Sequence, residues 1–372
     1  MKYYIISGEA SGDLHASNLV KEINKLDTDS EYRGWGGEML SSQGVEVVKH
    51  YRDLAFMGFY EVAANIRTIL KNFKYCKEDI LNYNPDAVIL VDYPGFNLRM
   101  AEFAHKKGFK VFYYIAPQAW AWKKSRVHKI KKYVDKLFTL LPFEEPFFRK
   151  YGIDAKYVGH PILDYLDTSH SDEEKELFFK KNNLQEKPII ALLPGSRNQE
   201  INTMLPLMLK MLPLFKDFQF VIAGAPAQGL GIYSKHIKQD NIKVLFEQGQ
   251  QIMKYADAAL ITSGTATLEA ALLGLPQVIC YKGNKLSIAI AKRIVNIKYI
   301  GLANLIMDKQ IIKELIQEDM TIENMHQELN LLLFDKDRRQ QLFNDYKELR
   351  DVLGGKGASV VTAEGIVGFL KG

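Results

Sequence analysis

Residues Ser7-Gly-Glu-Ala-Ser-Gly-Asp13 join an apolar run at 3–6 to a segment with apolar residues at helical spacing, 14–26. This order predicts a strand, a glycine-rich turn and a helix, and such a turn brings backbone N–H groups close to a ligand. Polar side chains in and beside the turn add two carboxylates, which suit sugar hydroxyls better than a pyrophosphate. We therefore predict a sugar-binding turn with four candidate residues, Glu9, Ser11, Asp13 and His15.

Apolar strand candidates alternate with helical patterns along the whole chain, which predicts parallel sheets covered by helices on both faces. In the first half they lie at 3–6, 32–35, 87–91, 111–115, 136–140 and 155–158, and in the second half at 189–193, 218–223, 242–246, 258–261 and 277–280. The pattern starts again near Lys187, so we expect an α/β protein with two doubly wound domains facing each other across a cleft. We place a hinge near Gly159-His-Pro161, with domains at 1–160 and 161–345 and a helical tail at 346–372.

The composition fits a soluble globular protein, with 47% hydrophobic and 25% charged residues among 372. Two distant cysteines, Cys76 and Cys280, favour a reducing compartment and argue against a zinc site. The chain enters a predicted strand after Lys2, and no apolar run is long enough to cross a bilayer. We therefore expect a cytoplasmic protein that lacks a signal peptide and is at most attached to a membrane surface. A homodimer is left open.

Two turns of the second half each follow a strand and open a helix, where amide groups and the positive helix end favour an anion. The first is Pro194-Gly-Ser-Arg197, whose arginine is suited to grip a diphosphate; Ser196 and Gln199 also fit a simple capping box. The second is Thr262-Ser-Gly-Thr-Ala266, with Glu269 beyond it. The predicted nucleotide site consists of Gly195, Ser196, Arg197, Ser263, Gly264, Thr265 and Glu269, with Asn304 on weaker grounds.

Asp92 ends the apolar run 87–91 of the first half, and Pro94 and Gly95 then turn the chain. A carboxylate at the carboxyl end of a strand is placed to act as a general base, although aspartate also caps helices there. Asn97 fits either a cap of the next helix or a contact with substrate. Trp120 and Trp122 fit either core anchors or contacts to a sugar face or acyl chain. We find no metal-binding spacing among the histidine and acidic residues, and expect no metal and no cofactor.

Two basic segments favour anionic partners. One runs through Lys123, Lys124, Arg126, Lys129, Lys131, Lys132 and Lys136, and fits a solvated helix face as well as attraction to anionic lipid or phosphorylated substrate. No nucleic-acid-binding motif accompanies it, so we expect no nucleic acid. The other is a predicted amphipathic helix, which fits core packing or interfacial membrane binding. Its candidate membrane-facing residues are Val62, Ile66, Arg67, Ile69, Leu70, Lys71, Phe73 and Lys74.

The opening SGEASGDLHASNLV resembles the signature of the lipid-A-disaccharide synthases, and six further stretches match that family in order. They are Asp92-Tyr-Pro-Gly-Phe-Asn97, Ala116-Pro-Gln-Ala-Trp-Ala-Trp122, Val158-Gly-His-Pro161, Leu193-Pro-Gly-Ser-Arg197, Thr262-Ser-Gly-Thr-Ala266 with Glu269, and Ala303-Asn-Leu305. The resemblance spans nearly the whole chain. It implies the two-domain GT-B fold, with UDP bound in the second domain and Glu269 on the ribose.

The resemblance also implies a reaction. An inverting glycosyltransferase of this family joins UDP-2,3-diacylglucosamine to 2,3-diacylglucosamine 1-phosphate (lipid X), with Asp92 as the base, at the inner leaflet of the inner membrane. Two alternatives stay open at this point: a UDP-sugar epimerase on the same scaffold, and a non-catalytic protein that binds lipid or nucleotide sugar. Product analysis separates the first alternative, and an unchanged function after substitution of Asp92 would indicate the second.

Overall fold

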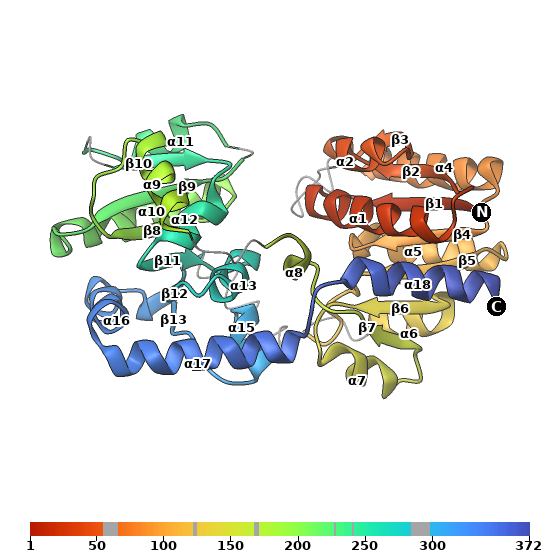
Figure 1. Cartoon of the computed structure of the whole chain (residues 1–372). Coiled ribbons are helices and arrows are strands. Elements are labelled where there is room, and N and C mark those ends of the chain that lie inside the picture. The colour runs from red at the N-terminus through yellow and green to blue at the C-terminus, as the bar shows by residue number, and fades with distance from the viewer. Residues whose placement is uncertain (55–65, 122–124, 167–170, 227, 240–241, 284–297) are drawn as a thin grey trace. The chain divides into compact units, whose positions relative to one another are not determined.

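The computed structural model describes residues 1–54, 66–121, 125–166, 171–226, 228–239, 242–283 and 298–372. The chain divides into two compact units, and each contains one parallel sheet (Figure 1). Unit 1 comprises Met1–Asp164 with Gly355–Gly372, and unit 2 comprises Tyr165–Gly354. The expected fold class of two Rossmann-like parallel-sheet domains is therefore confirmed.

Unit 1 has seven strands in the order β3-β2-β1-β4-β5-β6-β7. The strands are β1 (Lys2–Ser7), β2 (Glu31–Gly36), β3 (Glu46–His50), β4 (Ala87–Val91), β5 (Lys110–Tyr114), β6 (Lys136–Thr139) and β7 (Ala155–Tyr157). The helices are α1 (Ala10–Leu26), α2 (Glu38–Ser42), α4 (Ile66–Tyr83), α5 (Pro94–Lys106), α6 (Ser125–Tyr133), α7 (Glu144–Arg149) and α18 (Ala358–Lys371), with α8 (Ile162–Tyr165) at the boundary. A 3-10 turn, η1, spans Tyr51–Leu54.

Unit 2 has six strands in the order β10-β9-β8-β11-β12-β13. The strands are β8 (Ile189–Leu193), β9 (Gln219–Gly224), β10 (Lys243–Phe246), β11 (Ala258–Thr262), β12 (Gln277–Tyr281) and β13 (Glu314–Ile316). The helices are α9 (Asp172–Lys181), α10 (Asn198–Met208), α11 (Gly231–Ser234), α12 (Gly249–Tyr255), α13 (Thr265–Leu272), α15 (Leu302–Met307), α16 (Ile322–Phe334) and α17 (Lys336–Leu353). Two 3-10 turns, η2 (Leu209–Leu214) and η3 (Gln317–Asp319), complete it.

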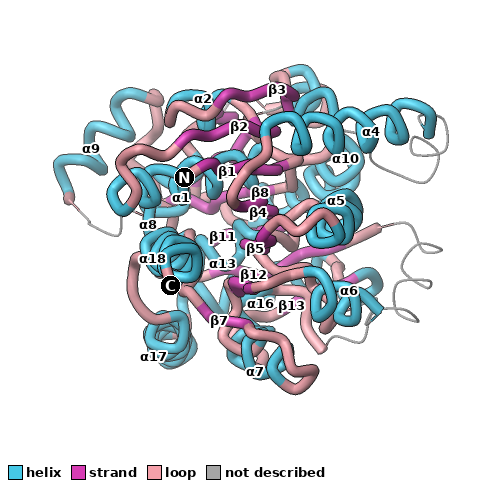
Figure 2. The backbone as a smooth tube through the Cα atoms, turned by 90° about the vertical axis from the view of Figure 1, so that its right-hand side faces the viewer, coloured by secondary structure: helices cyan, strands magenta, loops and turns pink. Residues whose placement is uncertain are grey.

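Successive side chains of the central strands of unit 1 enter two different cores, as the period of two of a strand requires. One core lies under α4, α5 and α6, and the other lies under α1 and α18, on opposite sides of the sheet (Figure 2). The first contains Tyr4, Ile6, Val88 and Leu90, and the second contains Tyr3, Ile5, Ala87 and Ile89. Strands buried on both faces explain why these runs are apolar without alternation.

The predicted boundaries differ from the structure in two places. The division falls between Asp164 and Tyr165, just beyond the hinge predicted at Gly159-His-Pro161. The predicted tail at 346–372 is not one element, because α17 belongs to unit 2 whereas α18 belongs to unit 1 and packs along α1. The edge strands β3 and β13 were not predicted from the sequence, and both are short and only partly apolar.

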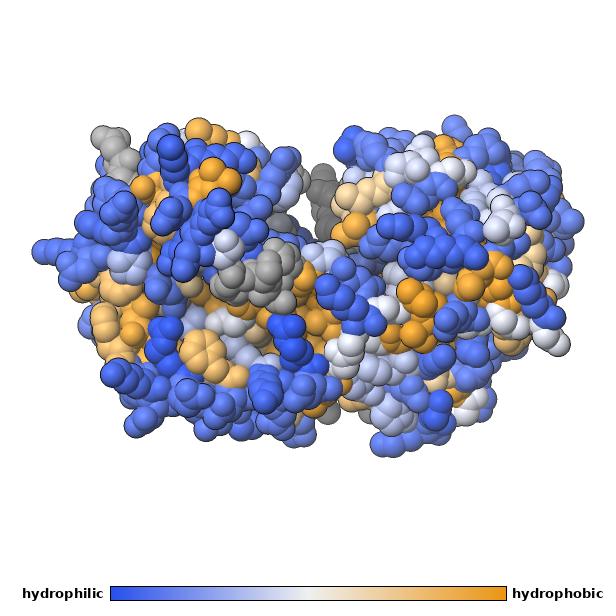
Figure 3. Space-filling view, in the orientation of Figure 1, coloured by the Kyte–Doolittle hydropathy of each residue, from blue (hydrophilic) through white to orange (hydrophobic). Residues whose placement is uncertain are grey.

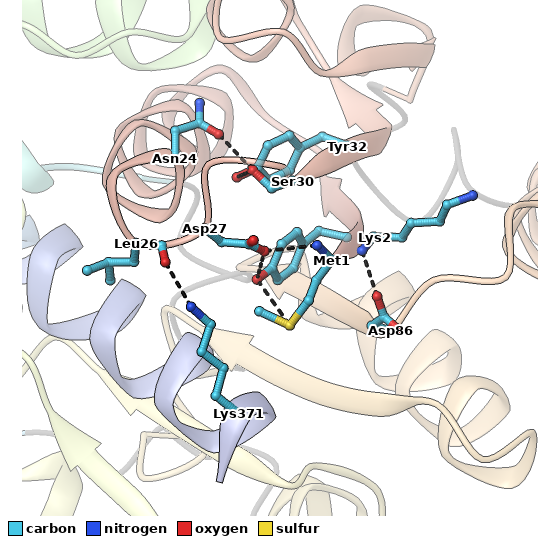
Figure 4. Close-up of polar contacts among 10 residues, drawn as sticks. Met1, Lys2, Asn24, Leu26, Asp27, Ser30, Tyr32, Asp86 and Lys371 are labelled. Carbon is cyan, nitrogen blue, oxygen red and sulfur yellow. Dashed lines mark hydrogen bonds and ion pairs between the residues drawn. The ribbon is translucent and has the colours of Figure 1, made fainter.

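The two ends of the chain are anchored at the start of the unit 1 sheet (Figure 4). The amino group of Met1 lies 3.1 Å from the Asp27 carboxylate, to which the Tyr3 hydroxyl also donates at 3.0 Å. Lys371, at the end of α18, donates to the Leu26 carbonyl at 3.0 Å and so satisfies a carbonyl of the last turn of α1. The Lys371 contact joins the end of α18 to the end of α1, along which α18 packs within unit 1.

The surface is largely hydrophilic on the face drawn in Figure 3, with apolar side chains scattered through it. Several gather along α18, where Val360 and Phe369 are exposed. Scattered apolar side chains are normal on a folded protein and need no partner. Among the described residues, no helix combines the length and the apolar character needed to cross a membrane.

Candidate active site

Asp92 follows β4 directly, at the carboxyl end of the unit 1 sheet. β1 is hydrogen-bonded to β2 on one side and to β4 on the other, so the strand order reverses between β1 and β4. Ligands of open parallel sheets bind outside the carboxyl ends of the strands at such a reversal. The topology thus puts Asp92 beside Gly8 and Glu9, which join β1 to α1; the turn is shorter than predicted, because α1 already begins at Ala10.

The backbone at Asp92 is tightly held. Asp92 and Tyr93 both have a φ of 47°, in the left-handed region that residues other than glycine rarely adopt. The Asp92 carbonyl accepts the Tyr113 hydroxyl at 2.6 Å and the Asn97 amide at 2.8 Å, and its N–H donates to the Tyr114 carbonyl at 3.1 Å. Backbone strain of this kind persists only where neighbours enforce it, and it clusters at functional sites.

The environment of the Asp92 carboxyl raises its pKa from 3.8 to about 6. Burial is the main cause, and the negative charge of Glu9 adds to it. The N–H of Tyr93 and the guanidinium of Arg126 act in the opposite direction. The result is a carboxylate that ionises near neutral pH, as a general base requires.

Only part of the glycine-rich turn after β1 is open to a ligand. Glu9 and Ser11 are exposed, and Glu9 lies close enough to Asp92 to raise its pKa. Gly8 is covered instead: a Cβ there would lie 2.4 Å from the Tyr93 ring. The structure thus brings Glu9 close to Asp92, and the Tyr93 ring covers the backbone at Gly8.

Asp13 and Asn97, predicted to bind the acceptor, serve the interior of the protein. The Asp13 carboxylate is buried and accepts the N–H groups of Gly37, Met39 and Leu40 at 2.7, 3.1 and 3.3 Å, at the start of α2. The Asn97 amide is fully buried and donates to three carbonyls at the ends of β1 and β4. We correct both assignments: these side chains position the strand ends and α2.

The remaining acceptor candidates have mixed outcomes. His15 lies beside His160 and Asp164, and burial lowers the pKa of its imidazole to about 4. Trp120 donates to the buried Glu144 carboxylate at 2.9 Å and packs edge-on against Phe143. Contact of His15 and Trp120 with an acceptor stays a prediction, and Trp122 lies outside the described residues.

In unit 2 the two predicted turns line one pocket of about 510 Å³. Its walls are the turn 195–197 after β8, the turn 262–266 after β11, and Glu269. Gly249 and Met253 of α12 and residues 223–226, at the end of β9 and just beyond it, also line the pocket, and the sequence did not indicate them. The first turns of α10 and α13 present N–H groups at this pocket, which is an arrangement that binds anions.

The cap of α10 differs from the one predicted. The helix begins at Asn198 with Arg197 at the N-cap, and the Glu200 carboxylate accepts the Arg197 N–H at 3.3 Å; the guanidinium cannot accept a bond in return, so the Ser196–Gln199 capping box is replaced by this contact. Gly195 has a φ of 104°, and a side chain there would be strained and would collide with Glu200. The glycine of this turn is therefore required by its backbone.

Glu269 lies in the second turn of α13 and borders the pocket. Burial raises the pKa of its carboxyl, and a hydrogen bond from Gln250 opposes the shift. The Ser263 hydroxyl donates to the Ile300 carbonyl at 3.1 Å, so this side chain is engaged within the protein.

Asn304 is not available to a nucleotide. Its side chain is fully buried, donates to the Ile312 carbonyl and to Glu314, and accepts the N–H groups of Ile311 and Ile312. These hydrogen bonds join α15 to the segment before β13. The predicted contact of the Asn304 side chain with UDP is therefore wrong for this structure.

The predicted membrane-facing helix corresponds to α4, and its apolar face divides between core and surface. Phe73 is buried and stacks on Phe96, and Ile69 packs against the same core. Leu70 is 58% exposed, and Arg67, Lys71 and Lys74 are exposed beside it. Phe73 is thus corrected to a core residue; Val62 and the side chain of Ile66 lie outside the described part of the chain.

Sequence reasoning missed Arg126, Tyr93 and Glu200 as site residues. Arg126 acts on the Asp92 carboxyl, and burial lowers the pKa of its guanidinium. In the sequence it was one of seven cations in a basic run, and only the fold separates it from its neighbours. Among the described residues, no group of three or more histidine, cysteine or acidic side chains could hold a metal ion.

Several solved structures share the fold of this chain. UDP-GlcNAc 2-epimerase from Neisseria meningitidis bound to UDP-GlcNAc superposes with a TM-score of 0.63 at 14% identity, covering 99% of this chain and 100% of its own. The S. aureus MnaA–UDP structure gives a TM-score of 0.67 at 13% identity, with coverage of 100% and 97%. A glycosyltransferase from Rickettsia africae gives 0.60 at 14% identity, with coverage of 100% and 98%. At these identities the likeness concerns the fold alone.

Sequence relatives are more specific. The lipid-A-disaccharide synthase of Syntrophus aciditrophicus is 38% identical over 363 residues, covering 95% of this chain and 94% of its own. That of Solibacter usitatus is 36% identical over 376 residues, with coverage of 100% and 98%. The profile of the lipid-A-disaccharide synthetase family matches residues 3–361. This chain therefore belongs to the lipid-A-disaccharide synthetase family.

Proposed function

We propose that this protein transfers 2,3-diacylglucosamine from its UDP conjugate to 2,3-diacylglucosamine 1-phosphate (lipid X). The products are the β(1→6)-linked disaccharide 1-phosphate and UDP. The observation that carries the proposal is the match to relatives of this activity along nearly the whole chain, including the segments that contain Asp92 and Arg197. The pocket in unit 2 and the carboxylate in unit 1 supply the two kinds of chemistry that the reaction needs.

Asp92 is the general base in this proposal. Its carboxylate takes the proton from the 6-hydroxyl of the acceptor while that oxygen forms a bond to the anomeric carbon of the donor. The bond from the anomeric carbon to the phosphate oxygen breaks, and the electron pair leaves with UDP. Attack from the face opposite UDP inverts the anomeric configuration. A pKa of about 6 keeps Asp92 ionised at neutral pH yet basic enough to accept a proton.

The pocket of unit 2 binds the UDP part of the donor. Arg197 offers a guanidinium that pairs with the diphosphate, and the first turn of α13 offers N–H groups from Thr265 onward. Glu269 borders the same pocket and is suited to accept hydrogen bonds from the ribose hydroxyls. Positive groups at the diphosphate stabilise the charge that develops on the leaving group.

The surface of α4 is our proposed contact with the inner leaflet of the inner membrane, where acylated substrates reside. Leu70 is exposed between the cations Arg67, Lys71 and Lys74, so one surface offers both apolar and basic groups. Such a combination binds anionic bilayers at their interface.

Mass spectrometry of the reaction products tests the proposed function. The protein is incubated with UDP-2,3-diacylglucosamine, with and without lipid X. We expect a disaccharide 1-phosphate and one UDP per disaccharide only when both substrates are present. Conversion of the UDP-sugar alone into an isomer would instead support an epimerase, and binding without any product would support a non-catalytic protein.

A further inference from the structure

A carboxylate already lies against the diphosphate-binding turn of unit 2. Glu200 Oε2 accepts the N–H of Ser196 at 3.1 Å and the N–H of Arg197 at 3.3 Å. Its other oxygen, Oε1, lies 3.6 Å from Nη1 of the Arg197 guanidinium. One carboxyl group thus engages two backbone donors and the arginine of this turn.

These donors are the ones that a diphosphate would use. They belong to the turn after β8, and Glu200 lines the same pocket as Arg197 and Gly264. The Glu200 side chain is 24% exposed, so solvent reaches it and a ligand can do so as well. A Cβ at Gly195 would lie 2.5 Å from Glu200 Oε2, so the glycine makes room for the carboxylate against the turn.

The contact between the Glu200 carboxylate and the turn becomes unfavourable when a diphosphate enters the pocket. The carboxylate is negative, and a diphosphate in the pocket brings further negative charge to the same donors. Like charges at such range repel. The Glu200 carboxylate must therefore either leave the turn or remain there and weaken the binding of the diphosphate.

We infer that Glu200 is a built-in competitor of the nucleoside diphosphate: its carboxylate engages the N–H groups of the proposed phosphate-binding turn and lowers the affinity for UDP. This inference rests on the proposed UDP site. In the empty protein the carboxylate keeps the turn and Arg197 ordered. During turnover it favours departure of the product UDP, because the same donors regain a partner when the diphosphate leaves.

Glu200→Gln separates this role from helix capping. The glutamine oxygen still accepts the two N–H groups, so the cap of α10 is kept while the negative charge is removed. A matched control is Asp335→Asn, at the N-cap of α17 in the same unit, where the carboxylate accepts the N–H of Arg338 at 2.9 Å. Both substitutions neutralise a capping carboxylate, but only one of them lies at the pocket.

Isothermal titration of wild type, Glu200→Gln and Asp335→Asn with UDP and with uridine provides the test. We expect Glu200→Gln to bind UDP about 3- to 30-fold more tightly, since one like charge near a protein surface is removed. Its affinity for uridine, which carries no phosphate, should match wild type, and Asp335→Asn should match wild type for both ligands. A thermal melt of each protein verifies that it is folded.

The possible failures are distinguishable. Equal or weaker UDP binding by folded Glu200→Gln would overturn the competitor role while leaving the proposed UDP site intact. A parallel gain for uridine would also overturn it, because the effect would then come from a change in pocket shape. Absence of UDP binding by the wild-type protein would overturn the UDP site and this inference together. If Glu200→Gln does not fold, Glu200→Ser offers a smaller neutral acceptor with the same expected gain.

Discussion

The turn after β1 and the turn after β8 hold equivalent places in their sheets, but protein covers the first and the second borders an open pocket. Each follows the central strand beside which the strand order reverses. In unit 1 the Tyr93 ring packs on Gly8, where a Cβ would lie 2.4 Å away. In unit 2 a Cβ on Gly195, in the turn after β8, would lie 2.5 Å from Glu200 Oε2, whereas a Cβ on Gly264, in the turn after β11 that lines the same pocket, would meet no heavy atom of the described residues within 4 Å.

The difference agrees with the separate tasks that we propose for the two units. Burial of the Asp92 carboxyl raises its pKa, which suits proton transfer. The pocket of unit 2 is lined by Arg197, which Glu200 contacts, and by the start of α13, an arrangement that suits an anion. The same topology thus suits our proposed base in unit 1, where Tyr93 covers Gly8, and our proposed diphosphate site in unit 2, where the turns line a pocket.

The largest expected effect is on turnover in Asp92→Asn. Asparagine keeps the shape of the side chain but cannot accept a proton. Loss of a general base lowers the rate by roughly 100- to 10,000-fold. Steady-state kinetics with both substrates measures it, and a rate within threefold of wild type would remove Asp92 from the mechanism.

Asp13→Ala should destabilise unit 1 without altering the chemistry. Three N–H groups at the start of α2 lose their buried acceptor, which costs about 2–4 kcal/mol of unfolding free energy. Denaturant unfolding measures the loss, and turnover per folded molecule should stay near wild type. Lost turnover in a protein of normal stability would restore Asp13 to the acceptor site.

Arg197→Ala should weaken UDP binding in unit 2. A charge-assisted contact to the diphosphate contributes about 1.5–3 kcal/mol, so affinity should fall roughly 10- to 100-fold. Isothermal titration measures the affinity, and Arg338→Ala, at a distant site of the same unit, is a control for the loss of one arginine. Unchanged UDP affinity in Arg197→Ala would show that the pocket binds another ligand.

Asp92→Asn should also make the protein more stable at neutral pH. The folded-state pKa of Asp92 is raised to about 6, so from about pH 4 to 6 the folded protein retains a proton that the unfolded chain has released. Stability from this group therefore falls as pH rises through that window. At pH 7.5 the variant should gain about 3 kcal/mol, and at pH 5 less, by denaturant unfolding. If the variant and the wild-type protein are equally stable at both pH values, Asp92 is solvated like an ordinary surface carboxylate.

The smallest expected effect concerns the surface of α4. Replacing Arg67, Lys71 and Lys74 with glutamine should reduce co-sedimentation with anionic vesicles, each charge contributing roughly 1 kcal/mol near the surface. The matched control replaces three exposed lysines of unit 2, Lys175, Lys180 and Lys187. Equal loss from both triple variants would indicate non-specific attraction rather than a membrane-binding surface on unit 1.

Strand positions and strand-end turns were predictable from the sequence because doubly buried strands are continuous apolar runs. The edge strands β3 and β13 were not, since short strands with a polar face lack that pattern. The roles of Asp13, Asn97 and Asn304 could not be predicted either. The sequence does not show whether a polar side chain in a motif contacts a ligand or a buried backbone group. The backbone partners of these three side chains lie up to 91 residues away in the chain.

The division of labour between the units is tested most directly by measuring UDP affinity and turnover on the same preparations of Asp92→Asn and Arg197→Ala. We predict that Asp92→Asn binds UDP within about twofold of wild type while its turnover falls by roughly two to four orders of magnitude. Arg197→Ala should lose UDP affinity as well as turnover. Loss of UDP affinity in Asp92→Asn parallel to its loss of turnover would contradict the assignment of the base and the nucleotide site to different units.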